Sequence, residues 1–81
     1  MGMVSYIKHI PQLMRRAGAE NTQENKDMLD SIIRDVLSMH SCDSSEVWEK
    51  VKSIMYGGNL AAKKEFEDKV VKIFIKKLIA G

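Results

Sequence analysis

Four segments of the chain carry apolar residues at helical spacing, and breaks of only a few residues separate them. Each segment places its apolar side chains on one side of a helical wheel, which is the pattern of an amphipathic α-helix. Such short breaks are typical of connections between neighbouring helices. The sequence therefore predicts an all-α fold, a compact four-helix bundle-like domain. The predicted helices cover approximately residues 4–17, 22–39, 44–56 and 60–80.

The chain has 81 residues, which suits one domain, because most single cores hold about 50–250 residues. Its 44% hydrophobic and 30% charged residues are typical of a globular protein. The single cysteine excludes an internal disulfide, and no apolar run reaches the roughly 18 residues of a membrane-spanning helix. Residues 1–10 lack the long apolar stretch of a secretory signal. We therefore expect one domain over residues 1–81 and an intracellular, cytoplasmic location.

Pro11 lies inside the first segment and leaves two alternatives open. One is a continuous helix over residues 4–17 that is kinked near Pro11, because proline removes a backbone hydrogen bond and crowds the preceding turn. The other is a short turn followed by a helix that starts at Pro11. The apolar phase continues unbroken through Pro11, which favours the kinked helix. Gly18 then supplies a typical helix stop.

Side chains that can cap helices precede the three later segments. Asn21 with Glu24, and Asp43 with Glu46, have the spacing of a capping box. A pair of glycines ends the third segment, and Asn59 after it can cap the last helix. These signals predict where the later helices begin.

The last segment has an apolar surface wider than half its circumference, which is typical of a central helix that contacts several neighbours. Apolar surface that four helices cannot cover is available to a second copy in a homodimer, or to a helix of another protein. Trp48 shares a face with Val51 and Met55, which favours a core position over a partner groove. The candidate apolar partner surface comprises Trp48, Val71, Ile75 and Ile79.

The net charge of +2 is distributed unevenly along the chain. Residues 1–19 carry +3, residues 20–59 carry −4 and residues 60–81 carry +3. One interpretation is intramolecular pairing, in which the basic first and last helices lie beside the acidic middle helices. The other is a basic surface that attracts phosphates or an acidic protein. The candidate basic partner surface comprises Lys8, Arg15, Arg16, Lys69, Lys72 and Lys76.

Few side chains indicate catalytic or metal chemistry. His40, Cys42 and Asp43 lie together in one break, but a structural zinc site needs about four ligands and no second pair follows. Cys42 as a nucleophile would need a lowered pKa and a positioned base. Glu65 and Asp68 share a helical face that lysines surround, which indicates solvated ion pairs. We expect no enzymatic activity, no metal site and no cofactor.

Two sets of short stretches resemble parts of peptide-binding helical domains. Residues 14–18 followed by 26–28 are similar to part of Mediator-type KIX domains, and residues 44–48 resemble the start of their third helix. Residues 23–29 with 39–40 resemble the opening of MLLE domains. Both families bind peptides with small helical bundles, so the resemblance implies a peptide-binding role. It transfers no site residue to this chain.

We expect a non-catalytic protein–protein interaction or regulatory module, whose partner is another protein or a second copy bound through the last helix. The alternative is a small nucleic-acid-associated protein that binds phosphates through basic faces of the first and last helices. No aromatic residues interleave with the basic ones, and Glu46 and Glu49 make the third helix acidic, which disfavours entry into a DNA groove. Three positive charges on the first helix are few for membrane binding. No small-molecule substrate is indicated.

Overall fold

The computed structural model describes residues 5–80, and no β-strand occurs among them. They form one 3₁₀ helix, η1, and four α-helices, which confirms the prediction of an all-α domain with four helices. Residue 4, where the first helix was expected to begin, lies outside the described residues. The elements are η1 Ser5–His9, α1 Pro11–Ala17, α2 Gln23–Leu37, α3 Ser44–Met55 and α4 Leu60–Ala80.

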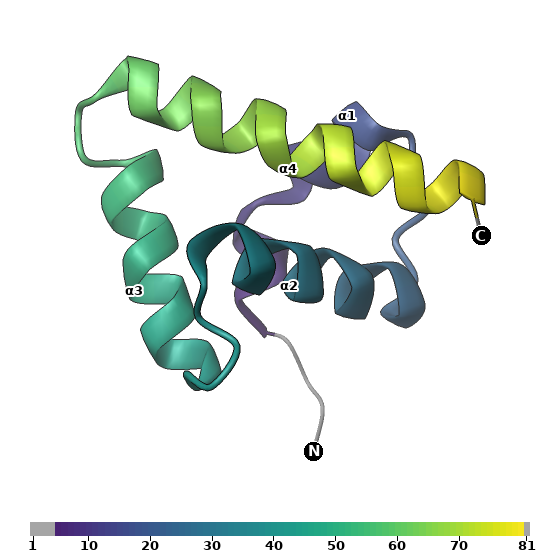
Figure 1. The fold of residues 1–81 in the computed structure, drawn as a ribbon, viewed down its shortest axis with the longest axis horizontal. Helices are drawn as coiled ribbons and strands as arrows, with labels where there is room; N and C mark the ends of the chain where they lie inside the picture. Colours follow the sequence, from purple (N-terminus) through teal and green to yellow (C-terminus); the bar gives the residue numbers. More distant parts are fainter. Residues whose placement is uncertain (1–4, 81) are drawn as a thin grey trace.

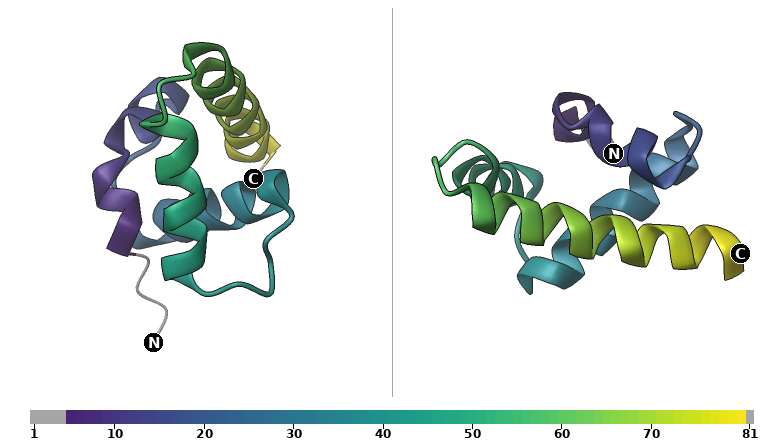
Figure 2. Two further views of the ribbon diagram at one scale, coloured as in Figure 1. Left: turned by 90° about the vertical axis from the view of Figure 1, so that its left-hand side faces the viewer. Right: turned by 90° about the horizontal axis from the view of Figure 1, so that it is seen from above.

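Helix α4 organises the fold. Its 21 residues correspond to about 32 Å at 1.5 Å per residue, close to the 33 Å of the longest dimension of the described chain. It runs across the whole width of the molecule and contacts α1, α2 and α3 (Figure 1). This confirms that the wide apolar surface of α4 serves several neighbours. Helix α3 runs across one end of the molecule rather than along α4, so these two helices cross steeply instead of lying parallel (Figure 2).

The core draws side chains from η1 and from all four α-helices. Burial of an aliphatic or aromatic side chain stabilises a fold by about 1.5–3 kcal/mol. The short elements η1 and α1 bury Tyr6, Ile7, Leu13 and Met14, so they contribute a large share of this stabilisation for their length. The buried core side chains are Tyr6, Ile7, Ile10, Leu13, Met14, Leu29, Ile32, Ile33, Val47, Val51, Met55, Phe66, Val70, Val71 and Phe74.

Pro11 begins α1 and does not kink a continuous helix, so the favoured prediction for this segment is wrong. Ile10 before it has φ −130° and ψ 51°, which is not helical. Proline suits the first helical position because its missing N–H has no intrahelical partner there. The apolar residues keep their helical spacing across Pro11 because η1 and α1 both face the same core, to which Ile7 and Leu13 belong.

Helix α2 differs from its prediction at both ends. Thr22 caps it, since its Oγ1 accepts from the backbone N–H of Asn25 at 3.2 Å, so Asn21 is not the cap. The helix ends at Leu37 because Ser38 adopts a left-handed conformation with φ 55°. Serine is not a usual residue for that conformation, and the sequence offered no stop signal at this point.

The other predicted helix boundaries agree with the structure, apart from the end of α3. Gly18 ends α1 with φ 72°. Asp43 caps α3 by accepting from the N–H of Glu46 at 2.9 Å. Asn59 accepts from the N–H of Ala62 at 3.0 Å at the start of α4. Helix α3 ends at Met55, one residue before the predicted end.

Candidate functional site

A cleft of about 340 Å³ opens between η1, α1 and the beginning of α2. We name it the basic cleft. Two of its apolar lining residues, Ile7 and Met14, are also members of the hydrophobic core. None of the described residues that line it is acidic. Its apolar lining is Ile7, Pro11, Met14 and Ala19, and its polar lining is Lys8, Arg15, Asn21 and Lys26.

The three cations of the basic cleft come from three different elements. Lys8 lies on η1, Arg15 on α1 and Lys26 on α2. None of the three forms an ion pair with a carboxylate of residues 5–80. Three positive charges line one cleft and make no ion pair with the described acids, an arrangement that attracts anions.

The local folding of the chain explains how these cations meet. Gly18 turns the chain after α1, and its N–H donates to the carbonyl of Arg15 at 3.0 Å. The following N–H of Ala19 donates to the carbonyl of Met14, also at 3.0 Å. This turn brings the first turns of α2, with Lys26, to the same cleft as Arg15. Lys26 was not selected from sequence, because it lies within the net acidic segment.

The other cations of the candidate basic surface have different surroundings. Arg16 forms ion pairs with Glu67 at 3.2 Å and Asp68 at 2.7 Å, which join α1 to α4. Lys69 lines a separate cleft of about 250 Å³ that α2, α3 and α4 form. Lys72 and Lys76 are exposed on α4 and line neither cleft. Helices α1 and α4 are therefore neighbours, but only Lys8 and Arg15 of the six predicted cations share a cleft.

Of the four residues of the candidate apolar surface, Val71, Ile75 and Ile79 follow one another at four-residue spacing on α4, and Trp48 lies apart on α3. Val71 is only 6% exposed and belongs to the core. Trp48 is half-buried on α3, and α3 lies at the opposite end of the molecule from the C-terminal end of α4 (Figure 1). That end of α4 carries Ile75 and Ile79, which are 36% and 81% exposed. Phe66, Val70, Val71 and Phe74 of α4 are buried within one copy of the chain, whereas Leu60, Ile75 and Ile79 are exposed.

Trp48 attaches η1 to α3. Its ring stacks on Tyr6 with 6.1 Å between ring centroids and on His9 with 5.3 Å. The ammonium of Lys52 lies 5.7 Å from the centroid of the Trp48 ring, within cation–π distance. These contacts hold η1, which carries Lys8, against the remainder of the fold.

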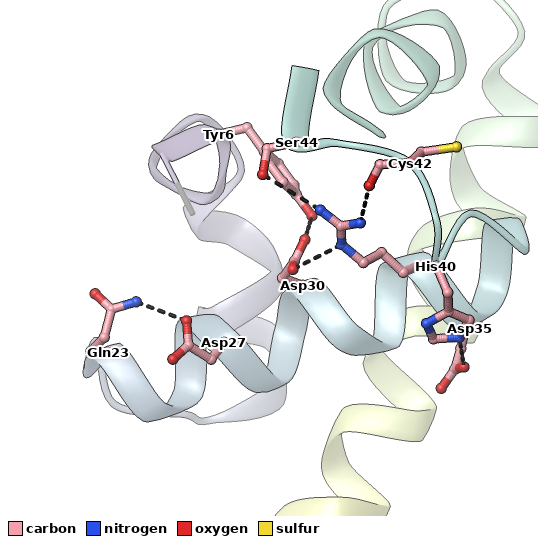
Figure 3. Close-up of polar contacts among 9 residues, drawn as sticks. Tyr6, Gln23, Asp27, Asp30, Asp35, His40, Cys42 and Ser44 are labelled. Atoms are coloured by element: carbon pink, nitrogen blue, oxygen red, sulfur yellow. Dashed lines mark hydrogen bonds and ion pairs between the residues drawn. The ribbon is translucent and has the colours of Figure 1, made fainter. Parts of the chain in front are cut away.

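A polar network that begins at Tyr6 also holds η1 against its neighbours (Figure 3). The hydroxyl of Tyr6 donates to Asp30 on α2. Arg34 donates from Nε to the same carboxylate at 3.0 Å and also donates to the carbonyl of Cys42 before α3. Burial raises the pKa of Tyr6 well above its usual range, and its hydrogen bond to Asp30 raises it further. The network therefore joins η1, α2 and the α2–α3 loop.

The residues considered for catalysis have ordinary structural partners. His40 lies beside Asp35 as an exposed pair (Figure 3). Partial burial raises the pKa of the Cys42 thiol, and the negative charge of Glu46 raises it further. Cys42 therefore stays a protonated thiol at neutral pH, which disfavours a nucleophilic role. Within residues 5–80, no three His, Cys, Asp or Glu side chains are arranged to hold a metal ion.

Comparisons of this chain with protein-family models, with curated proteins and with solved structures found no match. The resemblance of its short stretches to KIX and MLLE domains accordingly assigns no role to any residue. No helix within residues 5–80 combines the length and apolarity that crossing a membrane requires. The basic cleft is therefore the candidate functional site.

Proposed function

We propose that this chain is a non-catalytic protein-interaction module with a regulatory role, which binds an anionic segment of a partner protein in the basic cleft. The observation that supports this proposal is the set of three cations, Lys8, Arg15 and Lys26, without acidic partners around an apolar base. Recognition of acidic motifs by clusters of basic residues is a common mode of peptide binding.

The two kinds of lining have different roles in this proposal. The cations accelerate encounter and select for negative charge. The apolar base accepts an apolar side chain of the same segment, because burial of such a side chain supplies about 1.5–3 kcal/mol. A cleft of about 340 Å³ is small, so we expect a transient complex with a roughly micromolar dissociation constant.

The alternative of a nucleic-acid-associated protein has less support. A phosphate backbone is bound by cations that follow it over several phosphates. Arg16 is paired with two acids of α4, and Lys69 lines a different cleft from Lys8 and Arg15. Self-association through α4 also has less support, because Val71 is buried within one copy and only Ile75 and Ile79 of the candidate surface on α4 reach solvent.

Two charge-matched variants test the proposal. The cleft variant combines Lys8→Glu, Arg15→Glu and Lys26→Glu, and the control combines Lys69→Glu, Lys72→Glu and Lys76→Glu on α4. Fluorescence anisotropy of a labelled peptide of glutamate and leucine residues measures binding by each variant and by the unchanged chain. Far-UV circular dichroism checks that both variants remain helical.

We expect the cleft variant to lose at least about tenfold in affinity, because three favourable charges become unfavourable. The control has the same change in net charge, and we expect it to lose less than about threefold. Equal losses would show that only net charge matters and would contradict a localised site. Stronger binding of a labelled oligonucleotide than of the peptide, with loss in the α4 variant, would favour the nucleic-acid alternative.

A further inference from the structure

We infer that the basic cleft selects a phosphorylated side chain over a carboxylate. The inference rests on the proposed function and specifies its ligand. The occupant is a segment of a partner protein in which a phosphoserine or phosphothreonine stands beside a large apolar residue.

The charge of the lining favours a dianion. Lys8, Arg15 and Lys26 supply three positive charges, and no acidic side chain of residues 5–80 lines the cleft or pairs with them. A glutamate brings one negative charge, whereas a phosphorylated side chain brings about 1.5–2 negative charges on one compact group. The phosphoryl group therefore neutralises more of the cleft at a single position.

The donors of the lining match the acceptors of a phosphoryl group. Phosphorylation places three strong acceptor oxygens on one atom. The guanidinium of Arg15 offers a fork of N–H groups that fits two of these oxygens, and the ammonium groups of Lys8 and Lys26 act as further charged donors. Asn21 adds a neutral amide donor, and its side chain makes no hydrogen bond with residues 5–80.

The apolar lining requires a second feature of the ligand. Pro11 is exposed and Ala19 is half-buried, so they carry the accessible apolar surface of the cleft, because Ile7 and Met14 beneath them are only 2% and 5% exposed. A free phosphate ion would leave this surface in contact with water. A peptide covers it with an apolar neighbour of the phosphorylated residue.

Three peptides that differ at one position test the inference. The position holds phosphoserine, glutamate or serine, a leucine follows it, and the remaining residues are neutral. We expect isothermal titration calorimetry to give a dissociation constant at least about tenfold lower for the phosphoserine peptide than for the glutamate peptide, because each added charge-assisted hydrogen bond is strong. We expect the serine peptide to bind most weakly.

Two further readouts separate recognition of phosphate from nonspecific attraction. Arg15→Lys keeps the charge but removes the planar fork, which fits a phosphoryl group and a carboxylate alike, so we expect it to weaken both anionic peptides severalfold, whereas attraction by charge alone would leave both affinities unchanged. The second phosphate pKa is about 6. Lowering the pH from 7 to 5 should therefore weaken the phosphoserine peptide more than the glutamate peptide, whose side-chain pKa is near 4.3.

The outcomes distinguish the two proposals. Equal affinity for the phosphoserine and glutamate peptides would overturn phosphoryl selection and leave the proposed function in place. Failure of all three peptides to bind would overturn both. Tighter binding of a phosphodiester oligonucleotide than of the phosphoserine peptide would also overturn the inference, since a chain of monoanions would then fit the cations better.

Discussion

Tyr6 shows how a single side chain secures the N-terminal part of the fold. It is 3% exposed, stacks on Trp48 and donates a hydrogen bond to Asp30. Arg34 donates to the same carboxylate, so the charge of Asp30 is balanced where it is half-buried. A buried polar group that keeps its partners costs little, whereas one that loses them costs about 1–3 kcal/mol.

The raised pKa of Tyr6 predicts a pH dependence of stability. In the unfolded chain tyrosine titrates near 10.0, while the folded chain holds the proton to higher pH. The unfolded state therefore releases its proton first as the pH rises past 10. The free energy of unfolding should then fall by up to about 1.4 kcal/mol per pH unit from this group.

The substitution Tyr6→Phe tests this prediction. We expect it to lower the free energy of unfolding by about 1–2 kcal/mol at neutral pH, because the hydrogen bond to Asp30 is lost. It should also flatten the decline above pH 10 in urea denaturation, whereas Tyr56→Phe at an exposed position should leave that decline unchanged. A Tyr6→Phe variant with the same alkaline decline as the unchanged chain would contradict the assignment.

The sequence identified the charged side chains but did not predict which of them form ion pairs. It marked Arg15 and Arg16 alike as basic surface, yet Arg16 pairs with two acids of α4 while Arg15 lines the basic cleft. Lys26 was overlooked because acidic residues surround it in sequence. The position of a side chain around its helix, and not the charge of its neighbours, decides which cleft it faces.

At the element scale, short-range signals predicted most helix boundaries. Asp43 and Asn59 were recognisable caps because a side chain that bonds an N–H three residues later acts within its own segment. The start of α1 was not predictable in the same way. Both alternatives at Pro11 give the same apolar phase, and only packing of η1 against α2 and α3 distinguishes them.

The two left-handed helix ends allow a paired test of stability. Gly18 with φ 72° ends α1, and Ser38 with φ 55° ends α2. A side chain in this conformation costs about 1–2 kcal/mol, and glycine avoids that cost. An added Cβ at Gly18 meets no atom within 4 Å, so only the backbone conformation is at issue there.

We therefore expect Gly18→Ala to lower the free energy of unfolding by about 1 kcal/mol. Ser38→Gly should raise it by a few tenths of a kcal/mol, because relief of strain is partly offset by the greater entropy of unfolded glycine. Urea denaturation measures both effects. Changes of the same sign in the two variants would show that the two helix ends do not share this conformation.

At the scale of the whole molecule, the sequence did not predict how the helices meet. The short connections predicted neighbouring helices but not the angles between them, and α3 crosses the end of α2 and α4 (Figure 2). The charge blocks suggested pairing between basic and acidic segments. The pairs of Arg16 with Glu67 and Asp68 instead join two segments that are both net basic. A segment's net charge does not determine which of its side chains face a neighbouring helix.

The basic cleft forms only when the whole chain has folded, since its cations come from η1, α1 and α2. The most direct test of its role is a ¹H–¹⁵N NMR titration of the complete chain with the phosphoserine–leucine peptide. We predict that the largest amide shift changes map to Lys8, Arg15, Asn21 and Lys26, while the amides of residues 72–80 on α4 change little. Shift changes centred on the C-terminal half of α4, or none at all, would contradict the cleft as the binding site.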